Sequence, residues 1–227
     1  PEYQFAPRHY VTNQHNNSTY ARKSGVVKYN NVNASMKSMG LISVLLETKE
    51  VHEYASGVTA GEIISDVHGK KHDCVAAIID GVQKDLSFEV NSDCEIIGIK
   101  VNSDEGMYIL RHSCAHLLAQ AVTELFPNAK PTIGPPVEGG FYYDFAMDNI
   151  GDDELKEIEK RMQKLCRENF KIQRLEYNEN ELREIFKNNP YKIQIINDKL
   201  EAGQGSSLYK QGDFLDLCLG PHVPSTS

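Results

Sequence analysis

Apolar positions along the chain first form a regular pattern at residue 41, and the pattern there is that of short strands. Four apolar, β-prone runs are separated by polar turns: residues 41–46, 51–54, 75–79 and 95–101. Asp80-Gly81 directly follows the third run and is a strong hairpin signal. Leu86 and Phe88 suggest one further brief strand after that hairpin.

A short helix is predicted between the second and third runs. Thr59 and Glu62 have the spacing of a capping box, in which each side chain satisfies a backbone N–H of the first helical turn. Ile63, Ile64 and Val67 then give the helix one apolar face. The order β-β-α-β-β predicts a small β-grasp domain over residues 39–102, and none of its residues suggests catalysis.

Residues 107–227 carry longer helical patterns mixed with strands, so the chain as a whole is predicted to be α+β. Helices are expected at residues 108–126, 152–170 and 179–187, the second with Leu155, Ile158, Met162 and Leu165 on one face. Strands are expected at residues 141–145, 192–196 and 214–218. We expect an antiparallel sheet packed on helices, in a unit that is truncated at its C-terminus.

The first 38 residues differ from both units. They are rich in Asn, Ser and Tyr and show little apolar periodicity. Such a composition is typical of disorder, so residues 1–38 are predicted to be a disordered leader.

Composition narrows the class of protein. Hydrophobic residues make up 40% and charged residues 25% of the chain, as in ordinary soluble globular proteins. The net charge of −8 argues against broad, non-specific nucleic-acid binding, although a local basic patch would still permit RNA contact. No apolar run is long enough for a membrane helix, and the five cysteines are scattered, which favours a reducing cytoplasm.

Two short segments carry the candidate chemistry. His112 and His116 are four apart on a predicted helix and therefore point to the same side. Cys218 and His222 are also four apart, but Gly220-Pro221 between them demands a turn. Together they supply four ligands of the kind that zinc prefers. Either pair alone is more often a helix surface or a satisfied core site.

The same segments bring a specific resemblance. "RHSCAHLLAQAV", "IGPPVEGGFYYDF" and "DLCLGPHVP" closely resemble the editing domain of threonyl-tRNA synthetases of the bacterial type. The preceding unit resembles the TGS domain that opens those enzymes. The resemblance runs from about residue 41 to residue 224 in the same order.

The resemblance implies a tRNA-editing pocket whose catalytic residues match positions in this chain: His112, His116, Lys192, Asp216, Cys218 and His222. It also implies that Tyr143 helps to hold the terminal adenosine. If the resemblance is set aside, the sequence predicts that Lys192 is a solvated side chain on a strand. It likewise predicts that Asp216 is a turn residue and that Tyr143 is a core residue. Cys114 is expected in the buried core, and Tyr142 on the face opposite Tyr143.

The resemblance further implies what the site acts on. The parent enzyme would use ATP to join threonine to tRNA(Thr), and would be a cytoplasmic homodimer. This segment would bind the tRNA 3′ end and hydrolyse a serine ester made in error. ATP and zinc are expected only in a synthetic core outside this chain.

Several alternatives stay open. The family view is that editing needs no metal, but related alanyl-tRNA editing modules bind zinc through the same arrangement, so zinc is possible at His112, His116, Cys218 and His222. A covalent role for Cys218 is less favoured, because nothing nearby lowers its pKa. A free-standing hydrolase of mischarged tRNA and a non-catalytic zinc- or RNA-binding module are the competing functions.

Overall fold

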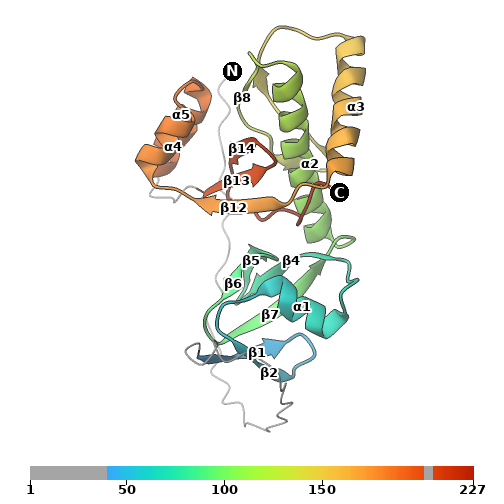
Figure 1. The fold of residues 1–227 in the computed structure, drawn as a ribbon, viewed down its shortest axis with the longest axis vertical. Coiled ribbons are helices and arrows are strands. Elements are labelled where there is room, and N and C mark those ends of the chain that lie inside the picture. Colours follow the sequence, from blue (N-terminus) through green and yellow to red (C-terminus); the bar gives the residue numbers. More distant parts are fainter. Residues whose placement is uncertain (1–39, 202–206) are drawn as a thin grey trace.

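A computed structural model describes residues 40–201 and 207–227 (Figure 1). The predicted leader, residues 1–38, lies outside the described residues. The described part is α+β, as the sequence predicts, and contains several small sheets. Within it, no helix combines the length and apolar character that crossing a bilayer requires.

The first unit is a five-stranded mixed sheet with strand order β2-β1-β7-β4-β5. Its strands are β1 (Leu41–Leu46), β2 (Val51–Ala55), β4 (Cys74–Ile79), β5 (Val82–Asp85) and β7 (Cys94–Lys100). Strands β1 and β7 pair in parallel, and the other neighbours pair antiparallel. Two short strands, β3 (Val58–Thr59) and β6 (Glu89–Val90), pair beside this sheet.

Helix α1 (Ala60–His68) covers one face of the sheet (Figure 1). The predicted capping box is confirmed: the Glu62 amide donates to the Thr59 hydroxyl, and the Glu62 carboxylate accepts from the Thr59 amide. Ile63 and Ile64 are buried against the alternating apolar side chains of β1. Burial of this amphipathic face holds α1 on the sheet.

The hairpin at Asp80-Gly81 is also confirmed. Both residues have positive φ, 47° and 80°, as the tight turn between β4 and β5 requires. The predicted strand through Leu86 and Phe88 is wrong, because β5 ends before them and β6 begins after them. Both side chains instead pack, partly buried, against the core of the first sheet.

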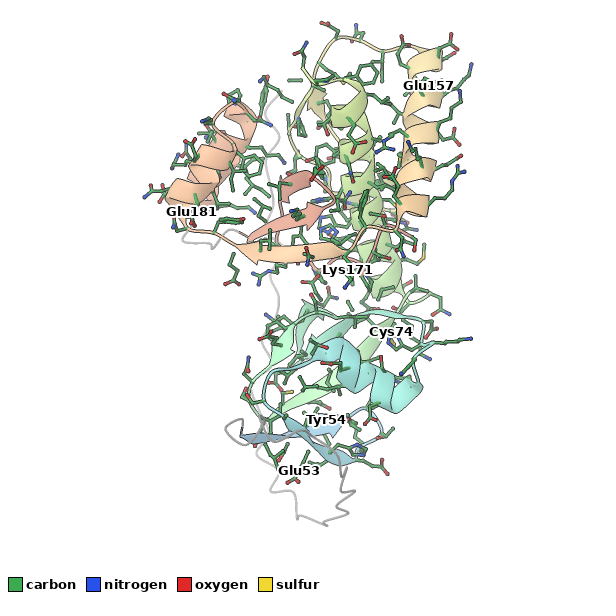
Figure 2. All side chains as sticks on the ribbon, in the orientation of Figure 1. Glu53, Tyr54, Cys74, Glu157, Lys171 and Glu181 are labelled. Carbon is green, nitrogen blue, oxygen red and sulfur yellow. The ribbon has the colours of Figure 1, made fainter. Side chains whose placement is uncertain are left out.

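Helix α2 (Asp104–Leu125) begins the second unit at an N-cap serine, Ser103, and is its central element. Helix α3 (Asp152–Glu168) packs along it, with Ile158 and Leu165 buried in the contact. Leu155 has the helical spacing of this face but is 53% exposed, so it does not join the buried part of the contact. Figure 2 shows Glu157 of α3 on the outer side of this helix pair.

The second sheet is antiparallel, with order β12-β13-β14. Its strands are β12 (Ile172–Glu176), β13 (Ser207–Gln211) and β14 (Phe214–Leu217), of which only β14 was predicted. Helix α4 (Glu179–Ile185) and helix α5 (Pro190–Glu201) share a core with one face of this sheet. Leu208 and Leu217 point to that core, and their neighbours Tyr209 and Asp216 therefore point to the other face.

The prediction of a strand at residues 192–196 is wrong, because these residues lie within α5. The Asn189 side chain accepts from the backbone N–H groups of Tyr191 and Lys192, and Pro190 occupies the first helical position. Asparagine followed by proline is a helix start, and it overrides the strand preference of the isoleucines that follow.

The aromatic segment at residues 141–145 is not one strand. Strand β10 (Gly140–Phe141) pairs with β9 (Pro136–Val137), and β11 (Phe145–Ala146) pairs with β8 (Lys130–Pro131). The residues between β10 and β11 are outside any strand, and Tyr143 is buried there against α2. This irregular loop brings an aromatic hydroxyl to the second sheet.

Candidate functional site

Helix α2 supplies two of the candidate residues. His112 and His116 lie one turn apart, with ring centroids separated by 5.2 Å. His116 is buried, whereas His112 is partly exposed. The same side of the helix also buries Ser113 and Gln120, so a polar stripe faces the second sheet.

Strand β14 and the loop after it supply the next two. Because side chains alternate along an extended chain, Cys218 follows Asp216 onto the face away from α4 and α5. The turn uses Gly220 at φ 70°, and a Cβ at this position would lie 1.8 Å from the Tyr209 hydroxyl oxygen. Only glycine fits there, and the turn brings His222 back beside Cys218.

The predicted convergence of the two segments is confirmed. Cys218 Sγ lies 3.2 Å from His112 Nε2 and 3.2 Å from His222 Nε2. The His222 ring centroid is 4.4 Å from those of both His112 and His116. One donor atom from each of the four side chains lies within 4.8 Å of the others.

Each histidine has a second partner that orients its ring. The Ser113 hydroxyl donates to the Ile109 carbonyl, so its oxygen accepts from His222 Nδ1, 2.9 Å away. His222 Nε2 therefore carries no proton, and its lone pair faces the cluster. His112 donates to the Pro221 carbonyl, and His116 Nδ1 lies 3.7 Å from Asp216 Oδ2.

A second, charged group adjoins the histidines. The Lys192 ammonium forms an ion pair with Asp216, and the Tyr143 hydroxyl donates to the other carboxylate oxygen of Asp216. Lys192 Nζ also donates to the Tyr143 hydroxyl oxygen over 3.0 Å. Lys192, Asp216 and Tyr143 thus contact one another, and His116 links them to the cysteine.

Burial keeps the imidazoles neutral. It lowers the pKa of His112 to about 4, and the neighbouring His116 adds to the effect. Burial likewise lowers the pKa of His116 and of His222, which also face one another. At neutral pH all three rings therefore offer lone pairs, either to a proton or to a metal ion.

The acidic groups are held in fixed states as well. Burial raises the pKa of Cys218 to about 12, so its sulfur is a thiol at neutral pH. Burial alone would raise the pKa of Asp216, but the Lys192 charge, the adjacent His116 imidazole and two hydrogen bonds outweigh it and lower that pKa. Burial, followed by the Asp216 charge, raises the pKa of Tyr143.

The four converging side chains could hold a zinc ion. Three imidazole nitrogens and one sulfur form a donor set that zinc prefers, and the hydrogen bond between His222 Nδ1 and Ser113 is of the kind usual around metal-bound histidines. The group stands alone in this respect within residues 40–201 and 207–227. Four protein ligands would complete a tetrahedral site.

The remaining predicted residues are less central. Tyr143 is buried and Tyr142 is 44% exposed, so the two face opposite ways as expected. Cys114 is only partly buried, so the prediction that it belongs to the buried core is wrong.

Three further contributors were not foreseen: Ser113, Tyr209 and Asp85. Ser113 lies next to His112 in the sequence, but this position does not indicate that its side chain contacts His222. Tyr209 and Asp85 carry no sequence signal, because their contacts join distant segments.

Comparison with known proteins gives one consistent family. Residues 206–227 match the family described as Threonyl and Alanyl tRNA synthetase second additional domain. The Threonine--tRNA ligase of Thermoplasma acidophilum is 52% identical over 169 residues, which cover 74% of this chain and 25% of the ligase. That of Pelobacter propionicus is 44% identical over 193 residues, 83% of this chain and 30% of the ligase. The matched part of the chain spans between 21% and 30% of the length of the curated relatives.

Proposed function

Since this chain corresponds in sequence to a segment of threonine--tRNA ligases, we propose that it hydrolyses the ester between serine and the 3′ end of tRNA(Thr). The observation that carries the proposal is the single buried cluster that unites His112, His116, Cys218 and His222 with Lys192, Asp216 and Tyr143. Imidazole, ammonium and phenol groups in one place suit the hydrolysis of an ester.

The need for such a reaction follows from the small difference between the two amino acids. Threonine has one methyl group more than serine, and a missing methyl group is worth only about 1–3 kcal/mol of discrimination. A synthetic site that selects threonine therefore sometimes accepts serine. A second site must remove serine from the tRNA, and it can exclude threonine by leaving no room for the methyl group.

His116 is the residue best placed to accept a proton from water. Its Nδ1 faces the Asp216 carboxylate, which favours the tautomer with a free lone pair on Nε2. The water oxygen then bonds to the ester carbonyl carbon as the imidazole takes its proton. When the ester C–O bond breaks, the imidazolium returns that proton to the ribose oxygen, and serine leaves as the carboxylic acid, which then gives its remaining proton to solvent.

Lys192 and Tyr143 act beside this base. Their N–H and O–H groups hold Asp216 in place and supply positive character near the charge that develops on the carbonyl oxygen. Cys218 is proposed as a neutral thiol that lines the site. A thiolate nucleophile is disfavoured, because burial raises the pKa of Cys218 to about 12.

Substrate approach is proposed from the side of His112. Of the four converging residues, His112 is the partly exposed one, while Cys218 and His222 are almost fully buried. The aminoacyl ester would therefore pass His112 first and reach His116 behind it. Tyr143 remains our proposed contact for the terminal adenosine, although its buried hydroxyl already serves Asp216.

We assign residues 39–102 to a TGS domain of the β-grasp type and residues 107–227 to the editing domain. The first assignment is supported by the mixed sheet, whose first and last long strands, β1 and β7, lie side by side in parallel with one helix across them. The second is supported by the family match over residues 206–227.

The proposed hydrolysis needs no metal ion. The second candidate function is that of a non-catalytic module that binds zinc. The four-donor cluster favours it. If zinc were bound, His112, His116, Cys218 and His222 would hold it, and a closed four-ligand shell would make its contribution structural.

The assay that tests the proposal follows release of serine from seryl-tRNA bearing the threonine anticodon. Threonyl-tRNA is the matched control substrate, and each ester without protein gives the spontaneous rate. Hydrolysis of the seryl ester well above the spontaneous rate, with the threonyl ester spared, is the expected result. Zinc binding with neither ester cleaved would favour the zinc module instead.

A further inference from the structure

We propose that Asp85, in the first sheet, is a positioning residue for the Cys218–His222 side of the site. Its Oδ1 accepts the backbone N–H of His222 over 2.9 Å, and its Oδ2 accepts the Tyr209 hydroxyl over 2.7 Å. Both carboxylate oxygens are thus used on residues of the second unit. This inference rests on the hydrolytic function proposed above.

Tyr209 extends the effect of Asp85 to the rest of the loop. Its side chain is buried, and its ring centroid lies 4.4 Å from that of His222. Its hydroxyl also lies directly under Gly220, where no Cβ would fit. By fixing this hydroxyl, Asp85 fixes the surface on which the Gly220 turn and the His222 ring both lie.

Asp85 is itself held at the contact between the two units. It is the last residue of β5 and pairs with Ala76 of β4. Ala76 belongs to an apolar cluster with Ile99 of β7 and Ile109 of α2, and Val223 packs against that cluster. The first sheet is therefore docked against the helix and the loop that form the site, and Asp85 lies at that junction.

Removal of the carboxylate would leave two donors without partners. The His222 N–H and the Tyr209 O–H are both in partly buried surroundings, where an unsatisfied donor carries the full cost of its desolvation. The loop would regain its hydrogen bonds by opening to water. Cys218, which is 6% exposed, would become accessible, and His222 would lose its place beside it.

Asp85→Asn provides a conservative comparison. Its amide oxygen can accept the His222 N–H, and its NH2 group can donate to the Tyr209 oxygen after the phenol hydrogen rotates. Both contacts survive without the negative charge. Glu53→Ala is the matched control, since Glu53 is an exposed residue of β2 at the far side of the first sheet from α2 (Figure 2).

The experiment measures the rate at which a thiol reagent modifies Cys218 in the full chain. Peptide mass spectrometry assigns the label to Cys218, and chelator treatment ensures that no metal shields the sulfur. Asp85→Ala is expected to raise the rate by about fivefold or more. Asp85→Asn and Glu53→Ala are expected to match the unchanged protein, with all variants folded by circular dichroism.

Equal protection of Cys218 in Asp85→Ala and Glu53→Ala would overturn the inference. If Asp85→Ala does not fold, Tyr209→Phe takes its place: faster labelling than in Asp85→Asn supports the inference, and unchanged labelling defeats it. The assay contains no tRNA, so it separates this inference from the proposed function. For an active protein, Asp85→Ala should also lower kcat for seryl-tRNA more than it changes KM, with Asp85→Asn restoring kcat.

Discussion

Lys192 and Asp216 form an ion pair with only 3% and 2% of their side chains exposed. Lys192 comes from α5 and Asp216 from β14, so the pair ties a helix to the strand that leads into Cys218. Tyr143 donates to the same carboxylate, and His116 Nδ1 faces it. A carboxylate so deeply buried depends on these partners for its charge.

Lys192→Met should destabilise the protein strongly, because it leaves the Asp216 charge buried without its cation. A loss of about 3–5 kcal/mol in the free energy of unfolding is expected from urea titration. Lys156→Met is the matched control: Lys156 pairs with Asp153 on the exposed surface of α3, where an ion pair contributes about 0–1 kcal/mol. Equal losses in both variants would contradict the buried pair.

Stability should fall as the pH drops from 6.5 to about 4. Burial lowers the pKa of His112 from 6.5 to about 4 in the folded protein, and lowers the pKa of His116 and His222 as well. The unfolded chain therefore takes up protons that the folded chain does not, and each such histidine costs about 1.4 kcal/mol per pH unit in this window. Urea titrations of metal-free protein at several pH values measure the slope.

His112→Gln is the control for this pH dependence. The slope of its free energy of unfolding against pH should be smaller, because one titrating histidine is missing. The Asp216 carboxyl, whose pKa is also lowered, contributes stability that is lost only below its unfolded pKa, near pH 3.8. A free energy of unfolding that stays flat between pH 6.5 and 4 would show that the imidazoles are not buried neutral.

Tyr143→Phe separates two roles of this residue. If Tyr143 serves mainly by donating to Asp216, the loss of its hydroxyl should lower kcat for seryl-tRNA while KM changes little. If its ring mainly stacks on the adenosine, phenylalanine should keep the full rate, because it retains the ring. We expect the fall in kcat, and Tyr142→Phe, at an exposed neighbouring position, should leave kcat unchanged.

Zinc should bind at the histidine–cysteine cluster and slow hydrolysis. A bound ion would occupy the lone pairs of all four donors, including the one on His116 that is proposed to accept the proton. Metal-free protein should therefore be active, and one equivalent of zinc should inhibit it reversibly. Activity that disappears with a chelator and returns with zinc would contradict this.

Local signals explain which parts of the fold were predicted correctly. The capping box at Thr59 and Glu62 and the Asp80-Gly81 turn depend on neighbouring residues, so their chemistry is visible in the sequence. Strand β12 was not predicted because it pairs with β13 across about thirty intervening residues, whereas β13 itself joins β14 through a short turn. The helix at Lys192 was missed because its isoleucines outweighed the Asn189-Pro190 start signal.

The candidate site shows the same division. The four-residue spacings of His112 with His116 and of Cys218 with His222 indicate the cluster from the sequence alone. The partners that orient it could not be foreseen, because Ser113, Tyr209 and Asp85 act through contacts between segments far apart in the chain. Sequence spacing reveals ligand-like side chains, whereas their support depends on tertiary packing.

The most direct test of the account is the single-turnover rate of seryl-tRNA hydrolysis by the unchanged chain and by the His112→Ala/His116→Ala double variant. The tRNA carries the threonine anticodon, and circular dichroism establishes that the variant is folded. The account predicts that the rate falls by about a hundredfold or more, as expected when a proton acceptor is removed. An undiminished rate in the folded double variant would contradict it.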